Sequence, residues 1–230
     1  MNDSTRTHAD TLTALLQERH SCRGFHPTPL PRETIQRVIE MAQRAASWCN
    51  AQPWQVHVLS AEATQAARTA LLEHIGHHAP RPDLPFPDAY VGVYRDRRRE
   101  CGLQLYRAVG VARDDRPGAE RQSMENFSFF GAPHVALVTA DRALGTYAAV
   151  DCGAFVNLFM LAAQSLGVAT IAQAALAAHA GFWRSHLGLA ESRAVVCGIS
   201  LGLEDALHPA NGFRTGRAPL EAVATWVGWA

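Results

Sequence analysis

The residues from Arg19 to Phe25 carry the side chains best suited to bind an anion. Two guanidinium groups, from Arg19 and Arg23, stand beside the imidazole of His20 and the hydroxyl of Ser21. Guanidinium groups donate charge-assisted, often bidentate hydrogen bonds to phosphate. The segment therefore predicts a site for phosphate or another anion, although a solvated helix end has a similar composition.

A second segment, Ala46–Trp54, is suited to a planar ring. It combines the polar side chains of Ser47, Asn50 and Gln52 with two tryptophans, and Pro53 favours an extended turn. Such a loop can hydrogen-bond the edge of a ring while an indole packs against its face. A turn that buries its tryptophans in the core is the alternative.

A third segment, Asn211–Pro219, lies near the end of the sequence and contains Arg214 and Arg217. We expect these guanidinium groups to close on the same anion as the first segment, because phosphate is commonly held by more than one arginine. Taken alone, the loop also fits a mobile tail.

Other chemistries find little support in the sequence. It has no GxGxxG after a predicted strand and no GxxxxGK[S/T]. His74, His77 and His78 stand without an HExxH motif, so we interpret them as solvated histidines rather than metal ligands. The five cysteines are odd in number and form no CxxC pair, so neither a disulfide framework nor a zinc site is expected.

The composition is that of a globular protein with a sizeable core. The chain has 230 residues, 48% hydrophobic and 18% charged, with a formal net charge of zero, which argues against nucleic acid as a partner. Between Cys152 and Trp183 there is no charged residue; we interpret this stretch as a buried helix rather than a membrane span, because Asn157 and Gly167 interrupt it. A helix this apolar hints at a homo-oligomer. The polar N-terminus predicts a cytoplasmic protein.

The pattern of apolar residues predicts the elements that must position the three segments. Helices are expected near residues 12–19, from Pro31 to about 42, at 62–75, 97–109 and 148–166, and ending at Gly188. Strands are expected at 56–58, 135–139, 168–171 and 194–201, the last of them central, with one more at 225–227. Four prolines between residues 80 and 87 predict an irregular excursion that could be a substrate lid. Helices and strands do not alternate regularly, which favours an α+β fold.

Together, the three segments resemble the signatures of the nitroreductase family of FMN-dependent NAD(P)H oxidoreductases. The family's Arg-[His/Ser]-Ser-x-[Arg/Lys]-x-Phe run is matched by residues 19–25, its Ser-x-x-Asn-x-Gln-Pro-Trp run by residues 47–54, and its C-terminal Arg-x-Pro loop by residues 217–219. Each motif is weak alone. The joint match, in this order, covers essentially the whole chain.

The resemblance implies how one subunit would bind FMN. Arg19, His20 and Ser21 would contact the phosphate and the ribityl chain, and Arg217 would complete the phosphate clamp. Arg23 would reach the pyrimidine end of the ring and tune the flavin.

The resemblance also implies contacts from elsewhere. Ser47 and Asn50 would approach the flavin from the partner subunit, and Arg214 is a further cofactor-binding candidate. The backbone at Gln173 or Ala174 would lie near flavin N5, although relatives often have Glu and Gly at these positions.

The same resemblance implies the fold and the reaction. We expect one FMN-binding domain over residues 1–230, α+β with a mixed, mostly antiparallel sheet flanked by helices. Residues 80–121 would shape the substrate side, and a C-terminal arm, residues 203–230, would extend over the partner of a homodimer. In a ping-pong reaction NADH or NADPH would reduce FMN, and a small electron-poor acceptor such as a nitroaromatic or quinone would then enter the same place, without a catalytic side chain or metal.

Three alternatives remain. The first is another flavin reaction of the same family, such as reductive dehalogenation, ene reduction or flavin breakdown. The second is a non-catalytic flavin-binding dimer, and the third is an α+β domain without a cofactor.

Overall fold

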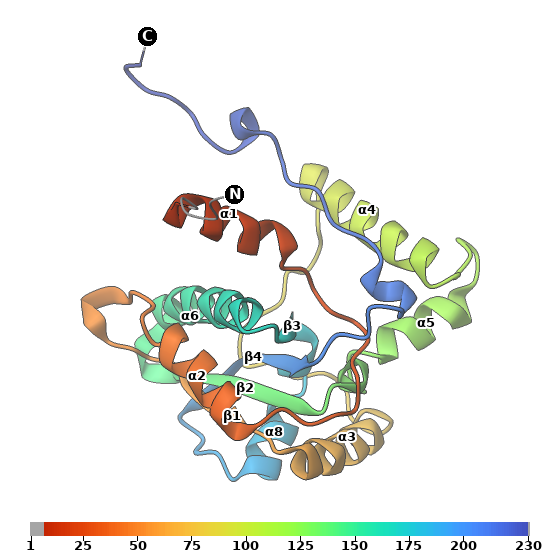
Figure 1. Ribbon diagram of the computed structural model, residues 1–230. Coiled ribbons are helices and arrows are strands. Elements are labelled where there is room, and N and C mark those ends of the chain that lie inside the picture. The colour runs from red at the N-terminus through yellow and green to blue at the C-terminus, as the bar shows by residue number, and fades with distance from the viewer. Residues whose placement is uncertain (1–6, 230) are drawn as a thin grey trace, which may run out of the picture.

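The computed structural model describes residues 7–229, and a four-stranded sheet lies at its centre (Figure 1). The strands follow the order β1-β2-β4-β3, and each neighbouring pair is antiparallel. Their bounds are β1 Gln55–Val58, β2 His134–Asp141, β3 Ala169–Gln173 and β4 Arg193–Gly202. The strands predicted near 56–58, 135–139, 168–171 and 194–201 are therefore confirmed, and β4 is central as expected.

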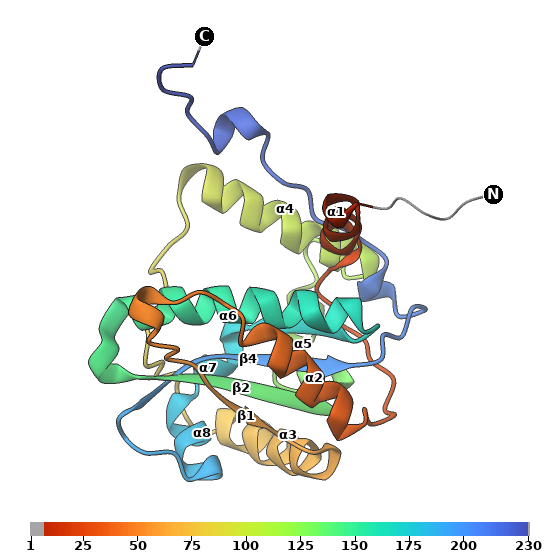
Figure 2. The ribbon, with the colours of Figure 1, turned by 60° about the vertical axis from the view of Figure 1, so that its left-hand side comes forward.

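Helices cover both faces of the sheet (Figure 2). Successive residues of β2 point to opposite faces, so Val138 packs in a cluster with α2 and α6, whereas Leu137 packs in a second cluster with α3 and α8. This arrangement is the α+β layering that the sequence predicts. The helices are α1 His8–Glu18, α2 Arg32–Ala42, α3 Ala61–Ile75, α4 Gly92–Ala108, α5 Arg116–Met124, α6 Gly145–Ser165, α7 Ala174–Ala177 and α8 Ala180–Leu187.

Helix α6 is the apolar helix that the charge-free stretch predicts, but only one of its faces is buried. Phe155 and Phe159 are fully buried in the core, whereas Tyr147 and Val150 are 58% and 60% exposed. By length and hydropathy alone, this helix could also cross a membrane. Its packing against α2 and the sheet identifies it as a core helix. Gly167 follows its end with φ +71°, a left-handed conformation that is typical of glycine after a helix.

The segment between α3 and α5 departs most from the sequence prediction. Residues 80–91 contain neither helix nor strand, as their prolines predict, but α4 begins at Gly92 rather than near Arg97. The apolar pattern does not predict α5, because this helix is largely polar. Its start is instead fixed by the Asp115 side chain, which accepts a hydrogen bond from Gly118 N at 2.8 Å.

Beyond β4 the chain makes the 3-10 turn η4 (Pro209–Asn211) and then leaves the body of the molecule as an extended arm (Figures 1 and 2). The arm passes α4 and contains one further 3-10 turn, η5 (Leu220–Ala222). The strand predicted at 225–227 is wrong, because within residues 7–229 this segment has no strand to pair with. A strand forms only where its backbone groups find hydrogen-bond partners.

Candidate functional site

A cleft of about 340 Å³ lies where the end of α1 meets the loop that follows η4. The first and third segments of the sequence, almost two hundred residues apart, come together here. The predicted site residues that line this cleft are Arg19, His20, Ser21, Arg23, Arg214 and Arg217.

The first segment reaches the cleft because it runs along the edge of the sheet. Cys22 N donates a hydrogen bond to the carbonyl oxygen of Thr170 on β3 at 3.0 Å, and Phe25 pairs with Glu204 just after β4. In extended backbone, neighbouring side chains point to opposite sides. Cys22 is therefore buried in the core, while Arg23 lines the cleft.

Asn211 ties the third segment to the first. Its Oδ1 accepts a hydrogen bond from Arg23 N at 2.6 Å, and its Nδ2 donates to the carbonyl oxygens of Gly24 and Asp205, both at 2.9 Å. Gly24 allows this close approach, since a Cβ there would lie 2.2 Å from the His208 ring. The sequence motifs give these residues no such role, because a hydrogen bond across this separation leaves no local pattern.

Four guanidinium groups in this cleft have no counter-ion of their own. Among residues 7–229 none of them forms an ion pair with a carboxylate. Three donate to backbone carbonyl oxygens instead: Arg23 to Ser21 at 3.2 Å, Arg214 to Asn211 at 2.8 Å and Arg217 to Thr215 at 3.1 Å. Burial, together with the charge of Arg217, lowers the pKa of Arg19. Burial likewise lowers the pKa of Arg23. Uncompensated positive charge of this kind fits a phosphate dianion such as that of FMN.

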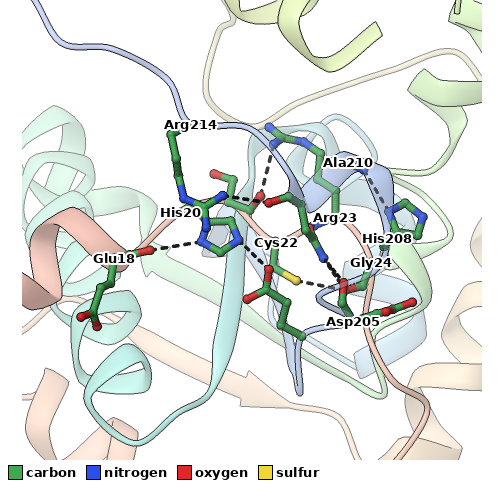
Figure 3. A network of polar contacts seen from close by, with 12 residues as sticks. Glu18, His20, Cys22, Arg23, Gly24, Asp205, His208, Ala210 and Arg214 are labelled. Carbon is green, nitrogen blue, oxygen red and sulfur yellow. Dashed lines mark hydrogen bonds and ion pairs between the residues drawn. The ribbon is translucent and has the colours of Figure 1, made fainter. Parts of the chain in front are cut away.

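His20 is held by its own chain. Its Nδ1 lies 3.2 Å from the carbonyl oxygen of Glu18 (Figure 3). Its Nε2 lies 2.9 Å from Oε1 of Glu204. The ring therefore forms part of the cleft wall, but both nitrogens already contact acceptors. Its predicted contact with a cofactor stays a prediction.

Ser47 and Asn50 lie outside the cleft. They belong to a turn around the 3-10 helix η1 (Trp48–Asn50), beside the beginning of α6. Ser47 Oγ accepts a hydrogen bond from Gln52 N at 3.0 Å. Within a single chain, this turn does not reach the cleft. A site shared between two subunits would have this arrangement, because the turn would then contact the cleft of the other subunit.

Gln173 and Ala174 stand at the end of β3 and also do not line the cleft. The Gln173 side chain is buried: its Nε2 donates to the carbonyl oxygen of Asn126 at 2.8 Å, and its Oε1 accepts from Ser200 Oγ. Because this amide is turned inward, only the backbone here remains available to a ligand.

The thiol of Cys22, which precedes Arg23, is not reactive, and the described residues contain no metal-binding cluster. Burial raises the pKa of Cys22 to about 11, and its Sγ lies 3.1 Å from the carbonyl oxygen of Gly24, so the thiol stays protonated near neutral pH. Within residues 7–229 no group of three or more His, Cys, Asp or Glu is arranged to hold a metal ion.

Comparisons with known proteins agree with this geometry. Residues 16–203 match the family model described as "Nitroreductase family". The chain is 35% identical to a 4-nitrobenzoate reductase of Pseudomonas putida, over 96% of this chain and 97% of that protein. It is also 35% identical to the nitroreductase NfnB of Mycolicibacterium smegmatis, over 92% of this chain and 91% of that protein.

Solved structures give the same result for the fold. The crystal structure of the FMN-dependent nitroreductase NfnB from Mycobacterium smegmatis in complex with NADPH matches with a TM-score of 0.91 at 34% identity, covering 96% of this chain and 100% of that one. The FMN- and NADPH-dependent NfnB from Sphigopyxis sp. strain HMH matches with a TM-score of 0.91 at 31% identity, covering 95% and 99%. The predicted nitroreductase-like fold is confirmed.

Proposed function

The chain belongs to the nitroreductase family, and we propose that it is an FMN-dependent oxidoreductase that uses NADH or NADPH to reduce electron-poor acceptors, nitroaromatic compounds foremost. The observation that carries this proposal is the cleft in which two distant segments bring together four guanidinium groups that have no counter-ion among the described residues. Relatives that reduce 4-nitrobenzoate support the choice of acceptor.

Different residues of the cleft contact different parts of FMN in this proposal. Arg19 and Arg217 hold the phosphate, and Ser21 and His20 lie along the ribityl chain. Arg23 is fixed by its backbone bond to Asn211 and by its side-chain bond to the Ser21 carbonyl oxygen. It presents a stationary positive charge to the pyrimidine end of the ring.

Arg214 supports the phosphate side, and the backbone at Gln173 and Ala174 lies toward flavin N5. Ser47 of the partner subunit and Asn50 of the partner subunit complete the site. The whole chain then acts as one FMN-binding unit, with residues 80–121 on the substrate side.

FMN, when bound, supplies the hydride chemistry. The chain therefore needs no acid–base pair. Its own contribution is to bind and orient the cofactor and to hold the Arg23 guanidinium where negative charge accumulates on reduction. A fixed charge of this kind stabilises the reduced state without transferring a proton.

A homodimer is proposed on the exposed surface of the single chain. Its accessible surface is 14288 Å², whereas a compact monomer of 25.0 kDa exposes about 10,000 Å². Part of the excess is apolar: Val223, Trp226 and Trp229 on the arm are 74%, 63% and 78% exposed. These side chains need a partner surface, so the arm extends over the second subunit.

The five cysteines are free thiols, as expected for a soluble protein of the cytoplasm.

Steady-state kinetics test the proposal. The FMN-loaded protein is assayed for NADPH oxidation with 4-nitrobenzoate varied at several NADPH concentrations. Because both substrates use the same face of the cofactor in turn, the double-reciprocal plots should be parallel lines. NADPH oxidation no faster than with free FMN contradicts the enzyme assignment, and intersecting lines contradict the alternating use of one site.

A further inference from the structure

Asp151, in the first half of α6, is a buried carboxylate that faces the turn containing Ser47 and Asn50. It is 9% exposed, and both its oxygens lie 3.2 Å from the backbone nitrogen of Trp48. Among the described residues no lysine, arginine or histidine forms an ion pair with it. Burial of a charged group without a cation is unfavourable. The hydrogen bond from the backbone N–H of Trp48 is therefore the contact that stabilises the buried Asp151 carboxylate.

The turn that Asp151 contacts has an unusual backbone. Cys49, Asn50 and Gln52 have φ values of +51°, +55° and +47°, in the left-handed region that residues other than glycine adopt at an energetic cost. Such a conformation persists only where surrounding contacts fix it. The turn therefore keeps this conformation only if other parts of the chain hold its backbone in place.

Helix α6 provides that support at two points one helical turn apart. The Tyr147 ring lies against the Trp48 ring, with centroids 4.5 Å apart, and Asp151 accepts the Trp48 N–H. Residues four apart share one face of a helix, so both contacts come from the same side of α6. The ribbon shows the turn beside the beginning of this helix (Figure 2).

We propose that Asp151 is a positioning residue that holds the Ser47–Gln52 turn in the conformation in which Ser47 and Asn50 reach the flavin of the partner subunit. The inference rests on the proposed function, because it needs FMN in the cleft of the second chain. Asp151 itself does not touch the cofactor. It acts through the backbone of Trp48, and a carboxylate is the stronger acceptor for that N–H because the hydrogen bond is charge-assisted.

The test is FMN affinity, measured by quenching of flavin fluorescence at protein concentrations where sedimentation shows only dimer. Asp151→Ala should raise the Kd for FMN about tenfold, the effect of one lost charge-assisted hydrogen bond. Asp151→Asn keeps an oxygen acceptor of the same shape and should recover part of that loss. The matched control is Asp141→Ala, which removes a carboxylate that also accepts a backbone N–H, from Ala143 at 2.9 Å, at the end of β2. The Kd should not change in this control.

A double-variant cycle separates positioning from general stability. Ser47→Ala/Asn50→Ala should weaken FMN binding by itself, and adding Asp151→Ala to it should cause no further loss, since the groups that Asp151 positions are already gone. An additive further loss, or an Asp151→Ala protein that binds FMN like the wild type while Ser47→Ala/Asn50→Ala does not, overturns the inference. Wild-type FMN affinity in Ser47→Ala/Asn50→Ala instead removes the partner contact from the proposed function, and the inference falls with it.

Discussion

Two clusters of arginines in this chain differ in one respect, the source of their counter-charge. In the first, Asp83 lies between Arg184 and Arg142, at 2.6 Å and 2.5 Å, and also accepts Val195 N at 2.9 Å. Burial raises the pKa of Asp83, but the hydrogen bonds from Val195 N–H, Arg184 and Arg142 outweigh it and hold this pKa below the ordinary value. The cluster is electrostatically complete within the chain.

Among residues 7–229, no carboxylate forms an ion pair with an arginine of the second cluster, which lies in the cleft. Arg19, Arg23, Arg214 and Arg217 line it, and the charge of Arg217 contributes to the lowered pKa of Arg19. The difference teaches how the two kinds of cluster can be distinguished. Arginines that stabilise the fold are neutralised by a carboxylate of the same chain, whereas arginines that bind an anionic ligand are neutralised by that ligand. Removing a member should therefore affect stability in the first cluster and binding in the second.

The largest effect is expected from Asp83→Ala. The substitution removes the carboxylate that two guanidinium groups and the Val195 N–H share, and removal of one partner of a buried ion pair typically costs about 3 kcal/mol or more. Since Arg142 is 39% exposed, we expect the lower end of that range: the free energy of unfolding, measured by chemical denaturation, should fall by about 3 kcal/mol. FMN affinity per folded protomer should stay unchanged. A wild-type unfolding midpoint would contradict the structural assignment of this cluster.

Arg19→Ala and Arg217→Ala should show the opposite pattern. Each removes charge-assisted hydrogen bonds of about 1.5–3 kcal/mol, so FMN binding should weaken by roughly ten- to a hundredfold. The stability of the FMN-free protein should not fall, because two like charges are separated. Lysine at either position should recover part of the affinity, since the charge remains but the planar fork is lost. Unchanged FMN affinity in both alanine variants rejects the clamp.

Arg23→Ala should affect the rate as well as binding. Without the fixed charge at the pyrimidine end, flavin reduction by NADPH should slow by about tenfold beyond what lower FMN occupancy explains. Stopped-flow absorbance of fully loaded protein measures this. Cys22→Ala is the neighbouring control: its protonated, buried thiol has no part in the reaction, so turnover should stay nearly intact. A Cys22→Ala protein that is fully loaded but inactive contradicts the mechanism.

A smaller effect is expected from a third cluster, formed by the histidines His74, His78 and His179. His179 is buried, its Nδ1 lacks a hydrogen-bond partner among the described residues, and its ring lies 5.5 Å from that of His74. Burial and the charges of His74 and His78 lower the pKa of His179.

This cluster makes stability depend on pH. A histidine whose pKa is lower in the folded than in the unfolded state stabilises the fold fully above the unfolded pKa of about 6.5. This stabilisation is lost as the pH falls below that value, because the unfolded state then binds more protons. The melting temperature should therefore drop between pH 7.5 and 5.5, and less so in His179→Phe. An equal drop in this variant would assign the pH dependence elsewhere.

The sequence predicts the elements better than the site. Periodicity locates the strands and most helices, and Gly167 and Gly188 mark helix ends where the structure has φ values of +71° and +62°. The four arginines of the cleft are grouped in the sequence by their affinity for phosphate and by the family resemblance, because no local pattern joins residue 19 to residue 217.

What the sequence could not predict depends on long-range contacts. Asp83, Asp151 and Asn211 act through hydrogen bonds to residues about a hundred or more positions away. Nothing in the neighbouring sequence marks them. The false strand at 225–227 has the same origin, since a short apolar run resembles a strand whether or not another strand lies beside it to pair with.

The central claim is that the arginine cleft binds FMN, and its most direct test is a fluorescence titration of the purified protein with FMN, together with the visible spectrum of the protein as purified. The account predicts a yellow protein that, once stripped of cofactor, quenches FMN fluorescence to a sharp end point at one FMN per protomer. A colourless protein that gains no flavin absorbance after incubation with FMN, and leaves its fluorescence unquenched, would contradict it.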